Sequence, residues 1–160
     1  MMRTVILTLL LVSANSAAGY QWVRYRGQNS HEPGLAIAGQ DADGRIIVVG
    51  RTGHESNTLP AKVKLDLGVA YISYAGREYK KTEFEFLKID NYRWVHGENG
   101  YVPPNAIVVG ETYYHEVLYA GRCKVEGVMC IGKVHRSQGV LYVPYRGSEH
   151  TCRQYDVLVQ

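Results

Sequence analysis

Apolar and polar positions alternate in short runs along the chain, and glycines and prolines separate the runs. Residues 62–67 show the pattern most clearly, because every second residue from Val63 is apolar and those between are charged. Residues 45–52 are rich in β-branched side chains, which favours a strand. The polar residues 53–60 end in Pro60 and predict a loop. No segment keeps a period of 3.6, so we expect helices of one turn at most and an all-β sandwich or barrel.

The order of these elements occurs twice, with an offset of 71 residues. Residues 33–89 align without gaps on residues 104–160 and are identical at 14 of 57 positions. A fixed repeat of this kind indicates duplicated structural units. Only Asp90-Asn91 separates the two copies, and a unit of about 70 residues buries little surface alone. The sequence therefore predicts one repeat over residues 20–90 and a second over 91–160, related by a pseudo-twofold axis and sharing one compact core.

Residues 1–19 have the pattern of a secretory signal peptide. Arg3 supplies the basic start, residues 5–12 the apolar segment, and residues 15–19 the small side chains of a cleavage zone. No other apolar run is long enough to cross a bilayer. We therefore expect a soluble, secreted, extracellular mature protein.

Charge and cysteine content narrow the classes further. The net charge of +3 is spread without blocks of one sign, so neither a nucleic acid nor a membrane surface is an indicated partner. The three cysteines, Cys123, Cys130 and Cys152, all fall in the second copy. A disulfide is consequently not part of the repeated scaffold. In an exported chain one pair and one thiol are expected, and all three pairings remain open.

The chain offers no catalytic or metal-binding motif. Glu83 and Glu85 flank Phe84 in an alternating segment, which indicates a solvated strand face rather than a glycosidase pair. The six histidines lack zinc spacing, and the calcium-like start at residues 41–44 has no distal Glu ligand. We therefore expect no cofactor, no metal and no enzymatic activity.

The repeated motifs together resemble the DM-nine repeat family. In the first copy they are Trp22-Val23, Gly39-Gln40-Asp41, Gly50-Arg51, Pro60-Ala61-Lys62-Val63, the segment from Tyr71 to Glu78 and the segment from Phe84 to Leu87. In the second they are Trp94-Val95, Gly110-Glu111-Thr112, Gly121-Arg122, Ile131-Gly132-Lys133-Val134, the segment from Tyr142 to Glu149 and the segment from Tyr155 to Leu158. The resemblance covers nearly the whole mature chain and implies two interlocked β repeats. Members with two repeats include invertebrate mannose-binding lectins that act in pattern recognition, often as homodimers.

The resemblance also implies a site for a mannose-type sugar. In the lectins an acid after the first motif glycine and the Lys of a Pro-Gly-Lys loop hold the sugar, and these positions are Asp41 and Lys62 here. In the second copy Lys133 is kept, but Thr112 replaces the acid and Glu111 stands beside it. This departure puts a second site in question.

The acid and amine also suit a sugar on chemical grounds. A carboxylate accepts hydrogen bonds from two hydroxyls, while an ammonium donates to a hydroxyl or ring oxygen. A face of Tyr71 or Tyr74 is a candidate for covering the apolar side of the ring.

Two functions follow from these observations. The first is a secreted, non-catalytic lectin that recognises mannose-type glycans or microbial polysaccharide in innate immunity. The alternative is a structural or protein-partner module that has lost sugar binding, for which Thr112 is the main support. The recurring pairs Arg51/Arg122 and Glu78/Glu149 are expected to fix turns or the surface between repeats.

Overall fold

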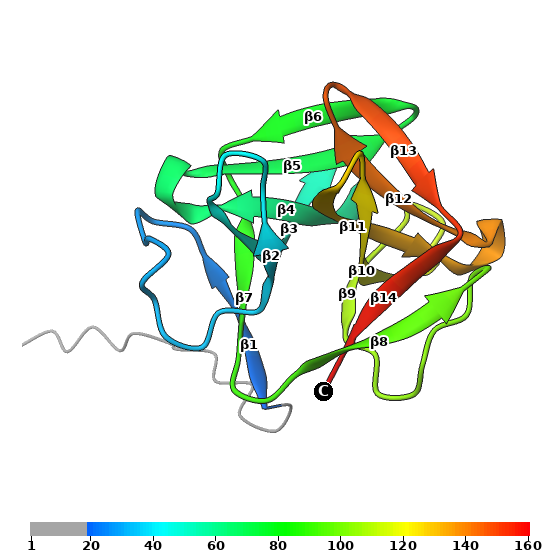
Figure 1. Ribbon diagram of the computed structural model, residues 1–160, viewed down its shortest axis with the longest axis horizontal. Coiled ribbons are helices and arrows are strands. Elements are labelled where there is room, and N and C mark those ends of the chain that lie inside the picture. Colours follow the sequence, from blue (N-terminus) through cyan, green and yellow to red (C-terminus); the bar gives the residue numbers. More distant parts are fainter. Residues whose placement is uncertain (1–18) are drawn as a thin grey trace, which may run out of the picture.

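The computed structural model describes residues 19–160, which form fourteen β-strands and two helices of a single 3-10 turn (Figure 1). The all-β prediction is confirmed. The first copy contains β1 (Tyr20–Arg24), β2 (Ile37–Gln40), β3 (Ile46–His54), β4 (Asn57–Lys64), η1 (Leu65–Leu67), β5 (Val69–Tyr74), β6 (Arg77–Lys81) and β7 (Glu85–Ile89). The second contains β8 (Arg93–Glu98), β9 (Val108–Glu111), β10 (Val117–Val125), β11 (Val128–His135), η2 (Arg136–Gln138), β12 (Val140–Tyr145), β13 (Ser148–Cys152) and β14 (Gln154–Val159). The predicted signal peptide lies outside the described residues except for Gly19, and neither helix in the described part has the length to span a membrane.

Two local predictions were wrong. Residues 53–60 are not a loop, because β3 and β4 continue into a tight hairpin whose central Glu55 and Ser56 have φ of 48° and 60°. The strand expected over residues 62–67 ends at Lys64, and the chain turns through η1. Gly68 closes that turn in the left-handed conformation, with its N–H donating to the carbonyl of Leu65.

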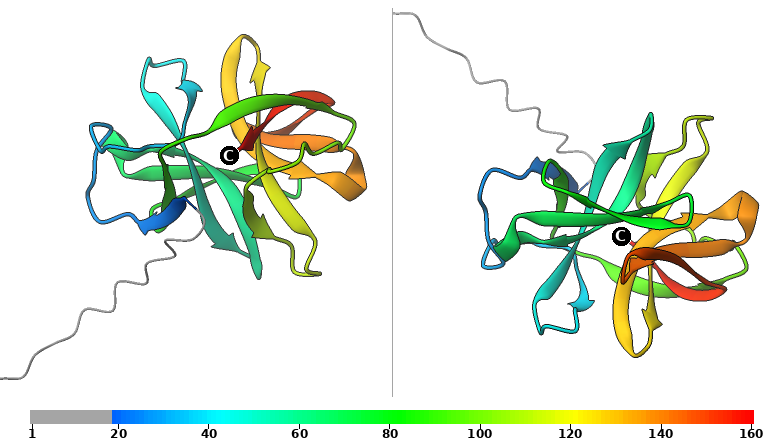
Figure 2. Two further views of the ribbon diagram at one scale, coloured as in Figure 1. Left: turned by 90° about the horizontal axis from the view of Figure 1, so that it is seen from below. Right: turned by 90° about the horizontal axis from the view of Figure 1, so that it is seen from above.

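All strands belong to one antiparallel sheet that runs through both copies. Its order is β1-β7-β3-β4-β5-β6 followed by β13-β12-β11-β10-β14-β8, so the copies meet between β6 and β13. The other strands, β2 and β9, pair with β3 and β10. Figure 2 shows the long hairpins β3–β4 and β10–β11 side by side at the centre of the molecule, where β4 and β11 also contact each other.

The junction between β6 and β13 is symmetric and uses the recurring glycines and glutamates. The N–H of Glu78 donates to the carbonyl of Gly147 at 3.1 Å, and the N–H of Glu149 donates to that of Gly76 at 3.0 Å. Each glutamate carboxylate also accepts the N–H of the opposite glycine, at 3.3 Å for Glu78 and 3.2 Å for Glu149. The expected role of these glutamates at the surface between repeats is confirmed.

The copies also exchange a strand contact. In β9, Glu111 pairs with Thr58 of β4, so an element of the second copy lies on the first. The reciprocal contact places β2 against β11. Gly39 and Gly110 lie at these two crossings, where a Cβ atom would meet Met129 or the backbone of Thr58. Their recurrence in the sequence is explained by this close approach.

The core is shared between the copies. One buried cluster joins Ile47, Val49 and Leu87 of the first copy to Val109 and Ile131 of the second, together with six other buried residues. Two further clusters belong mainly to one copy each, and the cluster of the first copy also includes Leu118 of the second. Because burial of apolar surface drives folding, the halves are expected to fold as one cooperative unit.

The recurring arginines are held in equivalent ion pairs. Arg51 contacts Glu85 at 2.6 Å, and Arg122 contacts Asp156 at 3.2 Å. Each guanidinium also lies over the Trp ring of the outermost strand of its copy, at 4.2 and 4.7 Å from the ring centroid. The arginines are structural, but Arg51 joins strands of its own copy rather than fixing a turn or the surface between repeats, whereas Arg122 also donates to the carbonyl of Ala38 in the first copy.

The open choice of disulfide is resolved in favour of Cys123 and Cys152, which link β10 to β13. Cys130 stays a buried free thiol on β11, directly across from Cys123 in the strand register. In the first copy Thr52 and Lys81 occupy the positions of the linked cysteines. The covalent link therefore reinforces the second copy alone.

Candidate functional site

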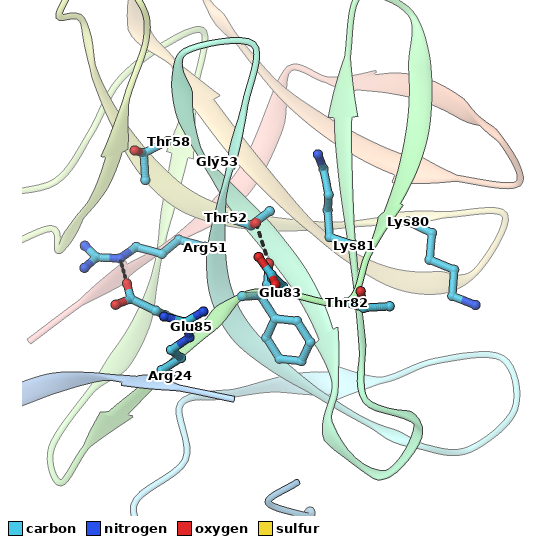
Figure 3. Close-up of a pocket in the computed structure, with 11 residues that line it drawn as sticks. Arg24, Arg51, Thr52, Gly53, Thr58, Lys80, Lys81, Thr82, Glu83 and Glu85 are labelled. Atoms are coloured by element: carbon cyan, nitrogen blue, oxygen red, sulfur yellow. Dashed lines mark hydrogen bonds and ion pairs between the residues drawn. The ribbon is translucent and has the colours of Figure 1, made fainter. Parts of the chain in front are cut away.

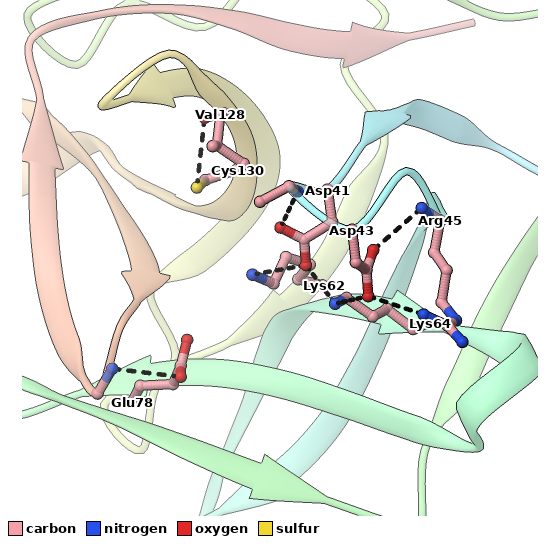
Figure 4. A network of polar contacts seen from close by, with 10 residues as sticks. Asp41, Asp43, Arg45, Lys62, Lys64, Glu78, Val128 and Cys130 are labelled. Atoms are coloured by element: carbon pink, nitrogen blue, oxygen red, sulfur yellow. Dashed lines mark hydrogen bonds and ion pairs between the residues drawn. The ribbon is translucent and has the colours of Figure 1, made fainter.

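In the first copy, the fold brings together the acid and the amine that the sequence singles out (Figure 4). Asp41 follows β2, Lys62 lies on β4, and Lys62 Nζ is 3.6 Å from Asp41 Oδ2. The same ammonium lies 5.4 Å from the ring centroid of Tyr71 on β5. These three groups lie close together, but the side chains of Lys62 and Asp41 are only 6% and 10% exposed.

Asp41 already has partners within the protein. Lys64 lies on the same face of β4 as Lys62, and its Nζ contacts Asp41 Oδ2 at 2.5 Å and Asp43 Oδ2 at 3.0 Å. The N–H of Ala42 donates to Asp41 Oδ1 at 2.8 Å. Burial raises the pKa of Asp41, but the hydrogen bond from Lys64 and the neighbouring ammonium charges outweigh it, so the net shift is downward. A sugar hydroxyl that binds Asp41 must compete with these contacts.

The acid and amine network predicts a pH-dependent stability. Hydrogen bonds from the N–H of Arg45 and from Lys64 lower the pKa of Asp43 to about 2. An Asp in the unfolded chain has a pKa of about 3.9. The contribution of the Asp43 charge is therefore complete above pH 4 and is lost as the pH falls through 2.

We expect Asp43→Asn to lower the urea midpoint of unfolding modestly at pH 6, because Lys64 loses one charged partner while the amide oxygen still accepts from Arg45. At pH 2 the midpoints of the variant and the native protein are expected to converge. Urea titrations at both pH values test this, and an equal difference at pH 2 and pH 6 would contradict it.

In the second copy, Lys133 has a different set of neighbours. Its Nζ donates to the carbonyl of Ser73 at 2.6 Å and lies 3.1 Å from Oε2 of Glu149. The rings of Tyr142 and Tyr74 lie near the ammonium, with centroids 5.4 and 5.7 Å from Nζ. Ser73 and Tyr74 come from the first copy, so both repeats build this site.

Lys133, Glu149 and the two tyrosines border an open cavity of about 670 Å³. The lining includes Tyr74 of the first copy and Thr112, Lys133, Tyr142 and Glu149 of the second. Thr112, which replaces the family acid, accepts the N–H of Glu116 with its hydroxyl at 3.1 Å. A cavity of this size accommodates a small ligand.

Glu111 and Tyr71 do not line this cavity. The carboxylate of Glu111 is exposed and lies 3.7 Å from the imidazole of His115. Tyr71 contacts Lys62 in the first copy instead. Of the sequence-predicted residues, the structure thus gathers Lys133, Thr112 and Tyr74 at one place, and Asp41, Lys62 and Tyr71 at another.

One carboxylate oxygen at this site has a single charged partner. Glu149 Oε2 is buried and is paired with the Lys133 ammonium at 3.1 Å, with no further donor near it among the described residues. A carboxylate has about four acceptor sites, so Glu149 keeps capacity for a further donor beside Lys133. Burial lowers the pKa of Lys133, and the charge of Glu149 offsets part of that shift.

Sequence reasoning assigned Glu149 to structure alone and passed over Tyr142. The signal was present in the repeat, because both residues recur 71 positions after Glu78 and Tyr71. What the sequence did not reveal is that one carboxylate serves two purposes. Glu149 Oε1 holds Gly76 at the junction, while Oε2 faces Lys133.

A second cavity, of about 790 Å³, lies on the first copy (Figure 3). Glu83 and Glu85 line it together with Arg24, Lys80 and Lys81. Glu85 is already paired with Arg51, and basic side chains line the same cavity. Glu83 and Glu85 therefore do not form an isolated pair of catalytic carboxylates. Within residues 19–160, no three side chains of the His, Cys, Asp or Glu type gather as a metal site.

Comparison with known proteins identifies relatives of the chain. Natterin-3 of Thalassophryne nattereri is 27% identical over 150 residues, which are 91% of this chain and 38% of the relative. The crystal structure of the nematode sperm cell motility protein MFP2B has a similar fold, with a TM-score of 0.64 at 15% identity over 87% of this chain and 45% of that one. The chain thus spans less than half the length of either protein. The family model of the DM9 repeat matches residues 40–152, and the chain belongs to the DM9 repeat family.

Proposed function

We propose that this protein is a non-catalytic, carbohydrate-binding recognition protein whose main site is the cavity beside Lys133. The observation that carries the proposal is the ion pair of Lys133 Nζ and Glu149 Oε2, 3.1 Å apart, whose residues line an open cavity together with Tyr74 and Tyr142. The two groups offer an acceptor and a donor at one point of an open cavity. Neighbouring hydroxyls of a neutral sugar require this combination.

The surroundings of the pair also fit a sugar. Tyr74 and Tyr142 present aromatic faces near the ammonium, and an aromatic face covers the apolar C–H side of a pyranose ring. Charge-assisted hydrogen bonds are about twice as strong as neutral ones, which helps them compete with water. A neutral ligand also leaves the opposite charges of Lys133 and Glu149 balanced.

The ligand class that we propose is a mannose-type glycan, displayed on a microbial surface and met outside the cell. Support for this class comes from the DM-nine lectin pattern around Lys62 and Lys133. Asp41 and Lys62 form the second candidate site of the same function, 3.6 Å apart. We expect that site to have the lower affinity, because Lys64 already pairs with the Asp41 carboxylate.

A glycan array probed with the purified mature protein tests the function, followed by calorimetric titration of methyl α-mannoside. The expected result is selective retention on mannose-type glycans and a weak affinity for the monosaccharide. Binding to no glycan would refute the proposal and favour the alternative of a structural or protein-partner module.

A further inference from the structure

The turn that borders the Lys133 cavity carries two adjacent tyrosines with exposed rings. Tyr113 and Tyr114 lie between β9 and β10 and are 61% and 86% exposed. Both line the cavity, and their rings meet edge to face with centroids 5.1 Å apart. Paired aromatic rings exposed beside a polar cavity are typical of a contact surface for a ligand.

The fold itself does not require these tyrosines. The same turn occurs in both copies and is closed in each by the same two backbone hydrogen bonds, all of 2.9 Å. The first copy has Ala42 and Asp43 where the second has Tyr113 and Tyr114. Because the turn forms equally well without aromatic residues, a structural need does not explain them.

The turn is also held firmly in place from the other copy. The N–H of Tyr113 donates to Asn57 Oδ1 at 2.8 Å. Asn57 is buried, and its amide nitrogen donates to the carbonyls of His54 and Glu55 at 3.0 and 2.8 Å. The backbone that carries the aromatic pair is therefore fixed before a ligand arrives, which reduces the entropic cost of binding.

We propose that Tyr113 and Tyr114 form a second sugar subsite, so that the ligand of this cavity is an oligosaccharide rather than a single sugar. This inference rests on the proposed function. One sugar residue occupies the position at Lys133 and Glu149, and the next lies against the tyrosine rings. The rings cover its apolar face, while the phenol hydroxyls stay in water.

The test compares two ligands by calorimetric titration, methyl α-mannoside and an α-linked mannotriose. The native protein is expected to bind mannotriose more tightly. The variant Tyr113→Ala/Tyr114→Ala is expected to lose about tenfold in affinity for mannotriose and to keep its affinity for methyl α-mannoside. The matched control is Tyr101→Ala, which removes another exposed tyrosine that does not line this cavity.

Three results would overturn the inference. The first is unchanged affinity of the double tyrosine variant for mannotriose. The second is an equal loss for both ligands with an unchanged melting temperature, since the rings would then belong to the first subsite. The third is that the native protein sediments as a dimer, whereas the double tyrosine variant sediments as a monomer and keeps its sugar affinity. If the native protein bound neither ligand, both the proposed function and the inference would fail. If it bound sugar but gave one of the three results above, the inference alone would fail.

Discussion

The double substitution Lys133→Met/Glu149→Gln is expected to weaken glycan binding by at least about a hundredfold. Each charge-assisted hydrogen bond to a ligand contributes about 1.5–3 kcal/mol, and this variant removes two. Both charges must be removed together. Lys133→Met alone leaves the Glu149 carboxylate buried without its partner, which costs about 3–5 kcal/mol of stability. Gln at position 149 keeps an oxygen that accepts the N–H of Gly76, so the junction between repeats persists.

The pseudo-twofold axis supplies the matched control for this experiment. Lys62→Met/Glu78→Gln makes the same substitutions in the first copy, where Glu78 accepts the N–H of Gly147 but Lys62 pairs with Asp41. We expect this variant to retain most of the affinity, and calorimetric titration with one mannose-type glycan measures both. If binding were instead lost in the first-copy variant and kept in the second-copy variant, the sugar site would be at Asp41 and Lys62.

The second large effect is expected on stability, from Gly110→Ala. A Cβ atom at Gly110 would overlap the backbone carbonyl of Thr58 in the other copy, well inside van der Waals contact. A backbone atom cannot move aside as a flexible side chain can, so the crossing of β9 over β4 must open. We expect a loss of about 3 kcal/mol, or a melting temperature about 6–12 °C lower.

The control for this prediction is Gly53→Ala on β3. There the nearest atom to a new Cβ is the carbonyl oxygen of Asn57 at 3.9 Å, an ordinary contact. Thermal unfolding followed by circular dichroism compares the two variants. Equal melting temperatures for Gly110→Ala and the native protein would show that the crossing of the copies contributes little to the fold.

Much of the architecture follows from the sequence because the same pattern of strands and turns occurs twice in it. The repeat gives the number of units, and the recurrence of Glu78 and Glu149 places charges at their junction. The hairpin over residues 53–60 was missed, because polar residues and Pro60 are also typical of loops. Pro60 is tolerated in β4 since β5 pairs with that strand only from Lys62 onward.

The candidate site was only partly predictable, and the reason lies in contacts between the copies. The motif brings Asp41 to Lys62, as the geometry bears out at 3.6 Å. The alternation over residues 62–67 places Lys64 on the face of Lys62, but that Lys64 also reaches Asp41 depends on the path of the turn after β2. The cavity at Lys133 depends on Tyr74 of the opposite copy, so it appears only when the repeats are packed together.

The most direct test of the central claim is a crystal structure of the protein soaked with methyl α-mannoside. The sugar is expected in the cavity of the second repeat, with hydroxyls within hydrogen-bond distance of Lys133 Nζ and the Glu149 carboxylate. A sugar bound at Asp41 and Lys62 alone, or an empty cavity at saturating ligand, would contradict the account.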